Sequence, residues 1–186
     1  MVNSKSKMIN VDHKQVHEVS REDIRAILDT VMDPEIPVLS VIDLGIVRNF
    51  DLQRIESTGD LKVIVVLTPT YMGCPAMDMI CMNVRLALAE HGFKNVEVSI
   101  TQSPAWTTAW MTEAGKEKLR EYGIAPPLDA ASAGRIDKLF GEPAPIACPL
   151  CGSVNTRLVS QFGSTACKSL YQCNECKEPF DYFKCH

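Results

Sequence analysis

The chain has 186 residues, of which 46% are hydrophobic and 23% charged, an ordinary balance for a soluble globular protein. Its formal net charge is −4 and its basic residues do not cluster, so a nucleic-acid-binding protein is not expected. The longest aliphatic run, Val63 to Leu67, is too short to span a membrane, and the polar start lacks a secretory signal. We therefore expect a cytoplasmic protein without nucleic-acid or membrane partners.

The first predicted helix begins at Ser20. Asp23 stands three residues further on, as in a capping box, and apolar residues recur at helical spacing: Ile24, Ile27, Leu28 and Val31. The segment Asp33-Pro34-Glu35-Ile36-Pro37-Val38 cannot continue a helix, because each proline removes a backbone donor and restricts the residue before it. It is predicted to form a rigid, acidic loop.

Two predicted strands, residues 46–52 and 61–67, flank a turn at 57–60 and form an antiparallel hairpin. A second predicted helix starts at Pro75 and stops at Gly92. Its apolar stripe contains Met77, Cys81, Val84 and Leu88.

A third strand is predicted at residues 96–100, and a last helix at 113–122 ends at Gly123. The order is αββαβα, which indicates an α+β fold with helices packed against a small mixed sheet. Residues 125–147 are rich in proline, alanine and glycine, a composition typical of a linker, in which a short helix near 136–140 is conceivable.

Two cysteine pairs, Cys148-x-x-Cys151 and Cys173-x-x-Cys176, predict a C-terminal zinc ribbon. Reduced or disulfide-bonded dithiols are the alternative, and four thiolates also suit iron. In the reducing cytosol, paired cysteine spacings favour metal ligation. Three nearby residues could be alternative ligands or could pack beside the ribbon without touching the metal: Cys167, Cys185 and His186.

Cys74 lies between the end of a predicted strand and Pro75. Pro75 suits the first helical position, so Cys74 is expected at or beside the N-cap, where the helix dipole and free N–H groups lower a thiol pKa. Such a sulfur could bind a metal or act as a nucleophile. Alternatively, it continues the apolar stripe of the helix as a buried thiol.

A catalytic thiol normally needs a base, and the histidines are poorly placed for that role. His13 and His17 precede the first helix, His91 ends the second, and His186 is the last residue. Three carboxylates could act as acids or bases, or could cap turns around the prolines: Asp33, Glu35 and Asp43.

Trp106 and Trp110 are four residues apart and would share one face if helical. They could close the α+β core. They could also form a docking surface, since tryptophan is enriched at interface hot spots.

Three of these segments together resemble the family of iron-sulfur assembly proteins that includes SufT. They are Asp33-Pro34-Glu35-Ile36-Pro37, Val41-Ile42-Asp43-Leu44-Gly45 and Thr68-x-Thr70-x-x-x-Cys74-Pro75. Within that family, four later segments resemble the PaaD type, an accessory subunit of the bacterial phenylacetyl-CoA epoxidase system. They are residues 103–110, 122–127, 162–168 and 179–185.

The resemblance covers nearly everything from Ser20 to His186. It divides the chain into a flexible tail (1–19), a SufT-like iron-sulfur assembly domain (20–124), a linker (125–147) and a zinc ribbon (148–186). It implies a role in aerobic phenylacetate breakdown, as a maturation protein that brings an iron-sulfur cluster to the reductase component of the epoxidase. The hydroxylation would lie elsewhere, because the sequence lacks the Glu-x-x-His pairs of di-iron oxygenases.

The resemblance also implies that Cys74 is a cluster ligand. Asp33, Glu35, Thr68 and Thr70 would shape its loop. Because clusters usually take four protein ligands, either the two protomers of a homodimer each contribute Cys74, or a client or a small thiol fills the open positions. Two alternatives remain: a non-catalytic interaction subunit without a cluster, and a thiol enzyme that uses Cys74.

Overall fold

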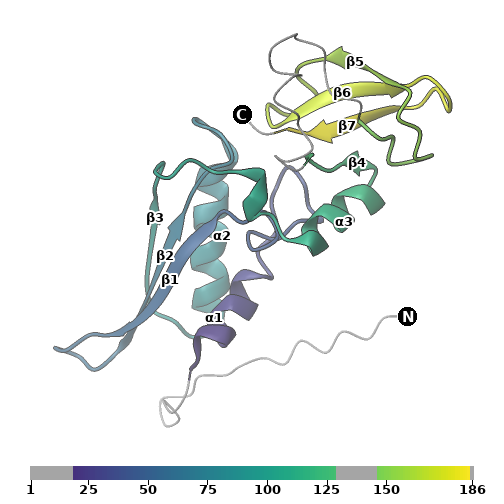
Figure 1. Cartoon of the computed structure of the whole chain (residues 1–186). Helices are drawn as coiled ribbons and strands as arrows, with labels where there is room; N and C mark the ends of the chain where they lie inside the picture. The colour runs from purple at the N-terminus through teal and green to yellow at the C-terminus, as the bar shows by residue number, and fades with distance from the viewer. Residues whose placement is uncertain (1–18, 129–145, 185–186) are drawn as a thin grey trace, which may run out of the picture.

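The structure, a computed structural model, describes residues 19–128 and 146–184 (Figure 1). The first helix, α1 (Arg21–Leu28), starts as predicted, because Ser20 and Asp23 cap it reciprocally. The Ser20 hydroxyl accepts from the Asp23 N–H at 3.2 Å, and the Asp23 carboxylate accepts from the Ser20 N–H at 2.9 Å. The predicted tail, apart from Val19, lies outside the described residues.

The first sheet has the order β1-β2-β3. Strands β1 (Val47–Arg54) and β2 (Leu61–Leu67) form the predicted antiparallel hairpin, and β3 (Asn95–Ile100) pairs parallel with β2, so the sheet is mixed. Alternate β2 residues are fully buried, as expected for one sheet face packed on the core: Val63, Val65 and Leu67.

Helix α2 (Ala76–Glu90) connects β2 to β3 and packs with α1 against the sheet (Figure 1). The predicted stripe is confirmed, since all four of its residues are buried: Met77, Cys81, Val84 and Leu88. Beyond the helix, Gly92 takes a φ of 92°, which ends the helix as predicted.

After β3 the chain forms a short 3₁₀ helix, η1 (Thr108–Trp110), and then α3 (Glu113–Glu121), which Thr112 caps. Trp106 lies before η1, so the shared helical face expected for Trp106 and Trp110 does not form. Trp106 is 4% exposed, and its indole N–H donates to the Leu44 carbonyl at 2.9 Å. The core interpretation is therefore right for Trp106.

The second sheet has the order β4-β7-β6-β5. Strands β5 (Thr156–Ser160), β6 (Lys168–Cys173) and β7 (Pro179–Phe183) are antiparallel, as a ribbon requires. The predicted α+β fold with a C-terminal ribbon is thus confirmed. The two-residue strand β4 (Ile124–Ala125) was not predicted, because it is too short to show a period and its partner lies far along the chain.

The two sheets are connected by direct contacts as well as by the polypeptide chain. Strand β4 follows α3 directly and pairs in parallel with β7 (Figure 1). Phe183 of β7 packs edge-on against Trp106, with ring centroids 6.0 Å apart, and both belong to the larger core. Ala125 and Ile146, at the two ends of the predicted linker, are buried in the smaller ribbon core. The predicted short helix near 136–140 lies outside the described residues, and the division into domains stays a prediction.

Within the described residues, none of the helices combines the length and apolarity needed to cross a bilayer.

Candidate metal sites

The four predicted ribbon cysteines converge on one point. The sulfurs of Cys148 and Cys176 are 3.8 Å apart, those of Cys151 and Cys173 are 3.6 Å apart, and all four lie within 4.8 Å of one another. Four thiolates placed tetrahedrally around zinc at about 2.3 Å have sulfur–sulfur separations of about 3.8 Å. The group therefore fits a tetrathiolate metal site.

Both cysteine turns are closed by a residue with left-handed backbone geometry. Gly152 has a φ of 76° and donates its N–H to the Cys148 carbonyl at 2.9 Å, while Lys177 has a φ of 68° after the second pair. Burial would raise the pKa of Cys173, but the backbone N–H groups of Cys176 and Glu175 outweigh it and lower that pKa to about 7. The second turn thus stabilises the thiolate form of Cys173.

Cys74 lies immediately before Pro75, the N-cap of α2, as predicted. The predicted lowering of its pKa is wrong. Half-burial raises the pKa of Cys74, and the carboxylates of Glu35 and Asp33 raise it further. The Ala76 N–H and the Tyr71 hydroxyl, which hydrogen-bonds the sulfur, only partly offset this rise in the pKa.

Tight local hydrogen bonds shape the acidic loop, whose carboxylates act on Cys74 electrostatically. Asp33 accepts from the N–H groups of Glu35 at 2.8 Å and Ile36 at 2.7 Å, which fixes the turn between the two prolines. Burial raises the pKa of Asp33 despite these bonds. The hydrogen bonds of Asp33 therefore add to the rigidity that the prolines give the loop, while its burial favours the neutral carboxyl.

The other two predicted loop residues, Thr68 and Thr70, line a cavity of about 330 Å³ together with Tyr71, Met72 and Trp106. Thr68 is 1% exposed, and among the described residues its hydroxyl has no hydrogen-bond partner. A buried unpaired hydroxyl is rare in folded proteins and is the type of group that a bound ligand satisfies.

Cys167 lies just before β6, and it is not part of the ribbon's four-sulfur group. Its side chain is 5% exposed and belongs to the larger core, with the sulfur 3.7 Å from a Glu35 carboxylate oxygen. Burial raises the pKa of Cys167 to about 11. Of the two interpretations of Cys167, packing without touching the ribbon's metal is the one that its position supports. Cys185 and His186 lie outside the described residues.

Sequence reasoning missed one neighbour of Cys74 and one contact of its acidic loop. Tyr71 lies in the segment from Thr68 to Pro75 that carries the family resemblance. Nothing in that pattern indicates that its hydroxyl hydrogen-bonds the Cys74 sulfur. Cys167 contacts Glu35, which lies 132 residues earlier in the sequence. Local sequence patterns do not predict a contact at that separation.

Asp43 and His91, the remaining candidates in the described part of the chain, lie apart from Cys74. Asp43 binds Thr112 and Lys118 of the α3 region at 2.9 and 2.5 Å. His91 follows the far end of α2, and its ring nitrogen contacts the Ala87 carbonyl at 2.7 Å. His13 and His17 lie outside the described residues.

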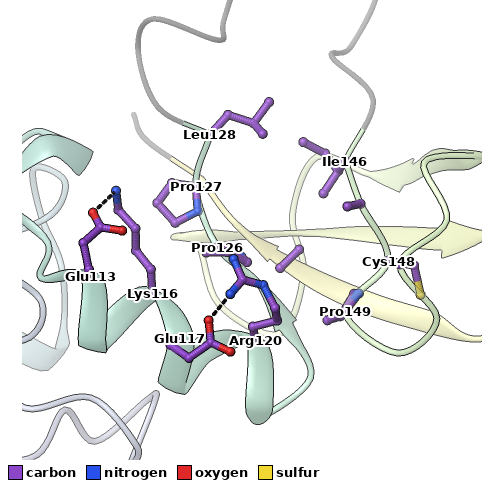
Figure 2. Close-up of a pocket in the computed structure, with 13 residues that line it drawn as sticks. Glu113, Lys116, Glu117, Arg120, Pro126, Pro127, Leu128, Ile146, Cys148 and Pro149 are labelled. Atoms are coloured by element: carbon purple, nitrogen blue, oxygen red, sulfur yellow. Dashed lines mark hydrogen bonds and ion pairs between the residues drawn. The ribbon is translucent and has the colours of Figure 1, made fainter.

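A larger cavity of about 390 Å³ separates α3 from the start of the ribbon (Figure 2). Figure 2 shows that its charged side chains pair along the helix, Lys116 with Glu113 and Arg120 with Glu117. Each of these charged side chains already has an oppositely charged partner, so we assign no site to this cavity.

The comparisons with known proteins agree with this arrangement. Residues 133–184 match the model of the PaaD zinc beta ribbon domain, and residues 21–101 match that of the iron-sulfur cluster assembly protein family. The chain is 48% identical over 171 residues to an Escherichia coli (strain K12) protein named as one subunit of a "Putative 1,2-phenylacetyl-CoA epoxidase", covering 92% of this chain and 93% of that protein. The chain belongs to the PaaD family.

Two further proteins each match a little over half of this PaaD-family chain. The "Fe-S protein maturation auxiliary factor" of Porphyromonas gingivalis (strain ATCC BAA-308 / W83) is 40% identical over 106 residues, 56% of this chain and 92% of that protein. A crystal structure from Bacillus anthracis, titled as a domain of unknown function, DUF59, is 25% identical and covers 53% of this chain and 89% of its own, with a TM-score of 0.44.

Proposed function

We propose that this PaaD-family protein is a non-enzymatic accessory protein of the phenylacetyl-CoA epoxidase system that assembles or delivers an iron-sulfur cluster, with the iron-sulfur reductase component as its client. The observation that carries the proposal is Cys74, a half-buried thiol at the start of α2 that contacts Tyr71 beside two carboxylates. The epoxidase name of the Escherichia coli relative and the maturation name of the Porphyromonas gingivalis relative support the two halves of the proposal.

Cys74 would hold the cluster as cargo. Iron-sulfur clusters are bound through cysteine thiolates, and a protein that supplies fewer than four ligands leaves positions that a client's thiolates can occupy one at a time. Asp33 and Glu35 would fix the loop beside the sulfur, while Thr70 and the unpaired Thr68 hydroxyl border the neighbouring cavity. A second copy of the chain is one source of further ligands.

The surroundings of Cys74 argue against a thiol enzyme. A nucleophilic thiol needs a base within hydrogen-bond reach, usually a histidine. Within the described residues His91 is the only histidine. The whole of α2, which is 15 residues long, separates it from Cys74. At 1.5 Å per residue that helix spans about 22 Å, which is far beyond direct contact.

We also propose that the ribbon binds zinc through Cys148, Cys151, Cys173 and Cys176. The closed tetrathiolate geometry is that of structural zinc sites, and the metal would contribute to the folding of the ribbon. Iron is the competing metal for four thiolates. The two are readily separated, because a ferric tetrathiolate site is coloured and a zinc site is not.

The test is metal and acid-labile sulfide analysis of protein purified anaerobically and reconstituted, comparing wild type with Cys74→Ser. We expect zinc near one per chain in both, and iron with sulfide in the wild type alone. Cys81→Ser is the matched control, because Cys81 is a buried thiol on α2, the helix that follows Cys74, and its charged neighbours are Arg85 and Asp78. It should retain iron.

The second candidate function is an interaction subunit that carries no cluster. Trp110 favours it in part, since its half-buried ring lies under the Arg48 guanidinium, 3.4 Å away, and remains accessible for docking. Zinc without iron in the reconstituted wild type, together with stable co-purification with epoxidase components, would replace the cluster carrier with this function.

A further inference from the structure

Arg48 stands at an irregular point of the first sheet. The register between β1 and β2 shifts between Val47 and Asn49, so Arg48 is an extra residue without a partner on β2. Such a β-bulge bends the strand locally and changes the direction in which a side chain points. Here the guanidinium lies over the indole ring of Trp110, with its central carbon 3.4 Å from the ring centroid.

The Arg48 guanidinium has no acceptor among the described residues. Its Nε atom is buried without a hydrogen-bond partner, and no described carboxylate forms an ion pair with it. By contrast Arg54, the other arginine of β1, donates to the Gly59 carbonyl at 2.8 Å. A buried N–H group without an acceptor is rare in folded proteins, because it has lost its water and gained nothing in return.

The indole under Arg48 is held in place from its own backbone. The Trp110 N–H donates to the Thr107 carbonyl at 3.0 Å. A Cβ atom at Gly45 would lie 2.8 Å from the Trp110 Cβ, so the two segments touch. The ring is half-buried against the larger core, and the rest of it is accessible. Guanidinium and indole are therefore already arranged before any partner binds, which lowers the entropic cost of binding.

We propose that Arg48 and Trp110 form a docking site for a carboxylate of a partner protein, an aspartate or glutamate side chain of an epoxidase component. The inference rests on the proposed function for the identity of the partner, and it adds the surface on which that partner docks. A guanidinium stacked on an aromatic ring keeps its donors in its own plane, where they match the two oxygens of a carboxylate.

The surroundings favour a protein as the source of this carboxylate. The chain has 23 acidic and 19 basic residues, so it does not attract anions in general, and an acidic group would be drawn to this unpaired cation specifically. A small anion on one guanidinium stays in water, where such a pair is weak. A protein partner would also cover the accessible part of Trp110 and exclude water from the pair, as in interface hot spots, which are rich in tryptophan and arginine.

The docking site lies at the end of the sheet from which the Cys74 loop starts. Val47 pairs with Leu67, the last residue of β2. Arg48 follows the first residue of this pair, and Thr68, which opens the segment leading to Cys74, follows the second. The two buried side-chain atoms that lack partners within residues 19–128 and 146–184 belong to Arg48 and Thr68. A partner on Arg48 is therefore docked beside the start of the loop that carries the thiol.

Binding of purified epoxidase components to the full-length protein tests the site. Each component is titrated singly by calorimetry, beginning with the iron-sulfur reductase. We expect Arg48→Gln, which removes the charge, to raise the Kd by about tenfold or more. Arg48→Lys restores the charge without the planar fork and should recover only part of the affinity. Trp110→Phe keeps an aromatic face and should lose less affinity than Trp110→Ala.

The matched control is Arg54→Gln, which removes the same charge from the other end of β1 and should bind as the wild type does. Thermal unfolding and zinc content check that every variant is folded. Added salt screens charges, so it should weaken binding of the wild type more than binding of Arg48→Gln. A purely structural role of Arg48 would leave this salt dependence unchanged.

Competition with small anions checks the chemistry of the ligand. At constant ionic strength, acetate and inorganic phosphate should both displace the component only at high concentration, because neither covers Trp110. Displacement by phosphate at low concentration, without a similar effect of acetate, would make this a phosphate site and overturn the assignment.

Failure of this inference differs from failure of the proposed function. If Arg48→Gln and Trp110→Ala are folded and bind the component like the wild type, the docking site is wrong, while iron and sulfide in the wild type still support the cluster carrier. If no component binds the wild type, the docking site is wrong whatever the iron content. If binding depends on Arg48 but reconstitution gives no iron, the docking site stands and the cluster role fails.

Discussion

The carboxylate of Asp43 was a candidate acid or base, but its hydrogen bonds give it a structural role. It is 4% exposed and accepts hydrogen bonds from Ser40, Thr112 and Lys118, which join the loop before β1 to α3. Burial would raise the pKa of Asp43, but the bonds from Lys118 and Thr112 outweigh it and lower that pKa. The turn-forming interpretation of this carboxylate is the one that its contacts support.

The lowered pKa of Asp43 predicts an acid-dependent stability. A depressed folded-state pKa contributes stability that is present above the unfolded value, near 3.8, and is lost as the pH falls through the folded value. Asp43→Asn should therefore lower the free energy of unfolding by about 1–3 kcal/mol at pH 7 and by less at pH 3. Urea unfolding at both pH values measures the difference.

The control for that experiment is Glu117→Gln, which removes an exposed partner of Arg120 and should change the free energy of unfolding little. An equal loss for Asp43→Asn at pH 7 and pH 3 would mean that the ionised form of Asp43 is not what stabilises the fold.

At the scale of the elements, the turn before β1 depends on how closely two segments approach. Gly45 has a φ of 65°, and a Cβ atom at this position would lie 2.0 Å from the Trp110 carbonyl oxygen. No side chain fits there without moving η1 away. The backbones of the loop before β1 and of the segment around Trp110 can therefore touch only because residue 45 has no Cβ atom.

A pair of glycine substitutions separates the two costs of adding a side chain. Gly59, in the hairpin turn, also has a positive φ, 75°, but open space surrounds it. Gly59→Ala should cost about 1–2 kcal/mol from the backbone conformation alone, and Gly45→Ala clearly more because the overlap adds to it. Equal unfolding free energies for the two variants would contradict the close approach described here.

The elements that sequence reasoning recovered are those whose signals are local. The capping box of α1 and the four-residue stripe of α2 each lie within a few turns of chain, so the pattern determines them. The cysteine pairs of the ribbon are predictable for the same reason. By contrast, β4 depends on a partner near the other end of the chain, and the Cys167–Glu35 contact depends on how two sheets pack. The pKa of Cys74 was misjudged because burial and two carboxylates, which outweigh the helix terminus, are tertiary features.

For the whole molecule, the ribbon is coupled to the larger core through β4 and β7 and through the contact of Phe183 with Trp106. If the ribbon's metal stabilises its fold, removing that metal should disturb Trp106 as well. In a Trp110→Phe background, a chelator is expected to shift the Trp106 emission to the red as Phe183 leaves its ring.

Cys148→Ser should reproduce that shift without chelator, because it removes one of the four ligands. Restoration of the original emission by added Zn²⁺ in the Trp110→Phe protein, but not in the Cys148→Ser protein, completes the test. An unchanged emission after the ribbon has lost its metal would show that the two parts are stable independently.

The pairing of β4 with β7 has a consequence for protein synthesis. Strand β4 is made before the ribbon, yet its partner β7 comes almost at the end of the chain, and Cys167 also emerges late. Because chains fold from the N-terminus as they are made, the first sheet and its helices can fold while the ribbon is still missing. A nascent or prematurely terminated chain would then lack Phe183, so the edge of Trp106 that this ring covers would stay exposed until translation is essentially finished.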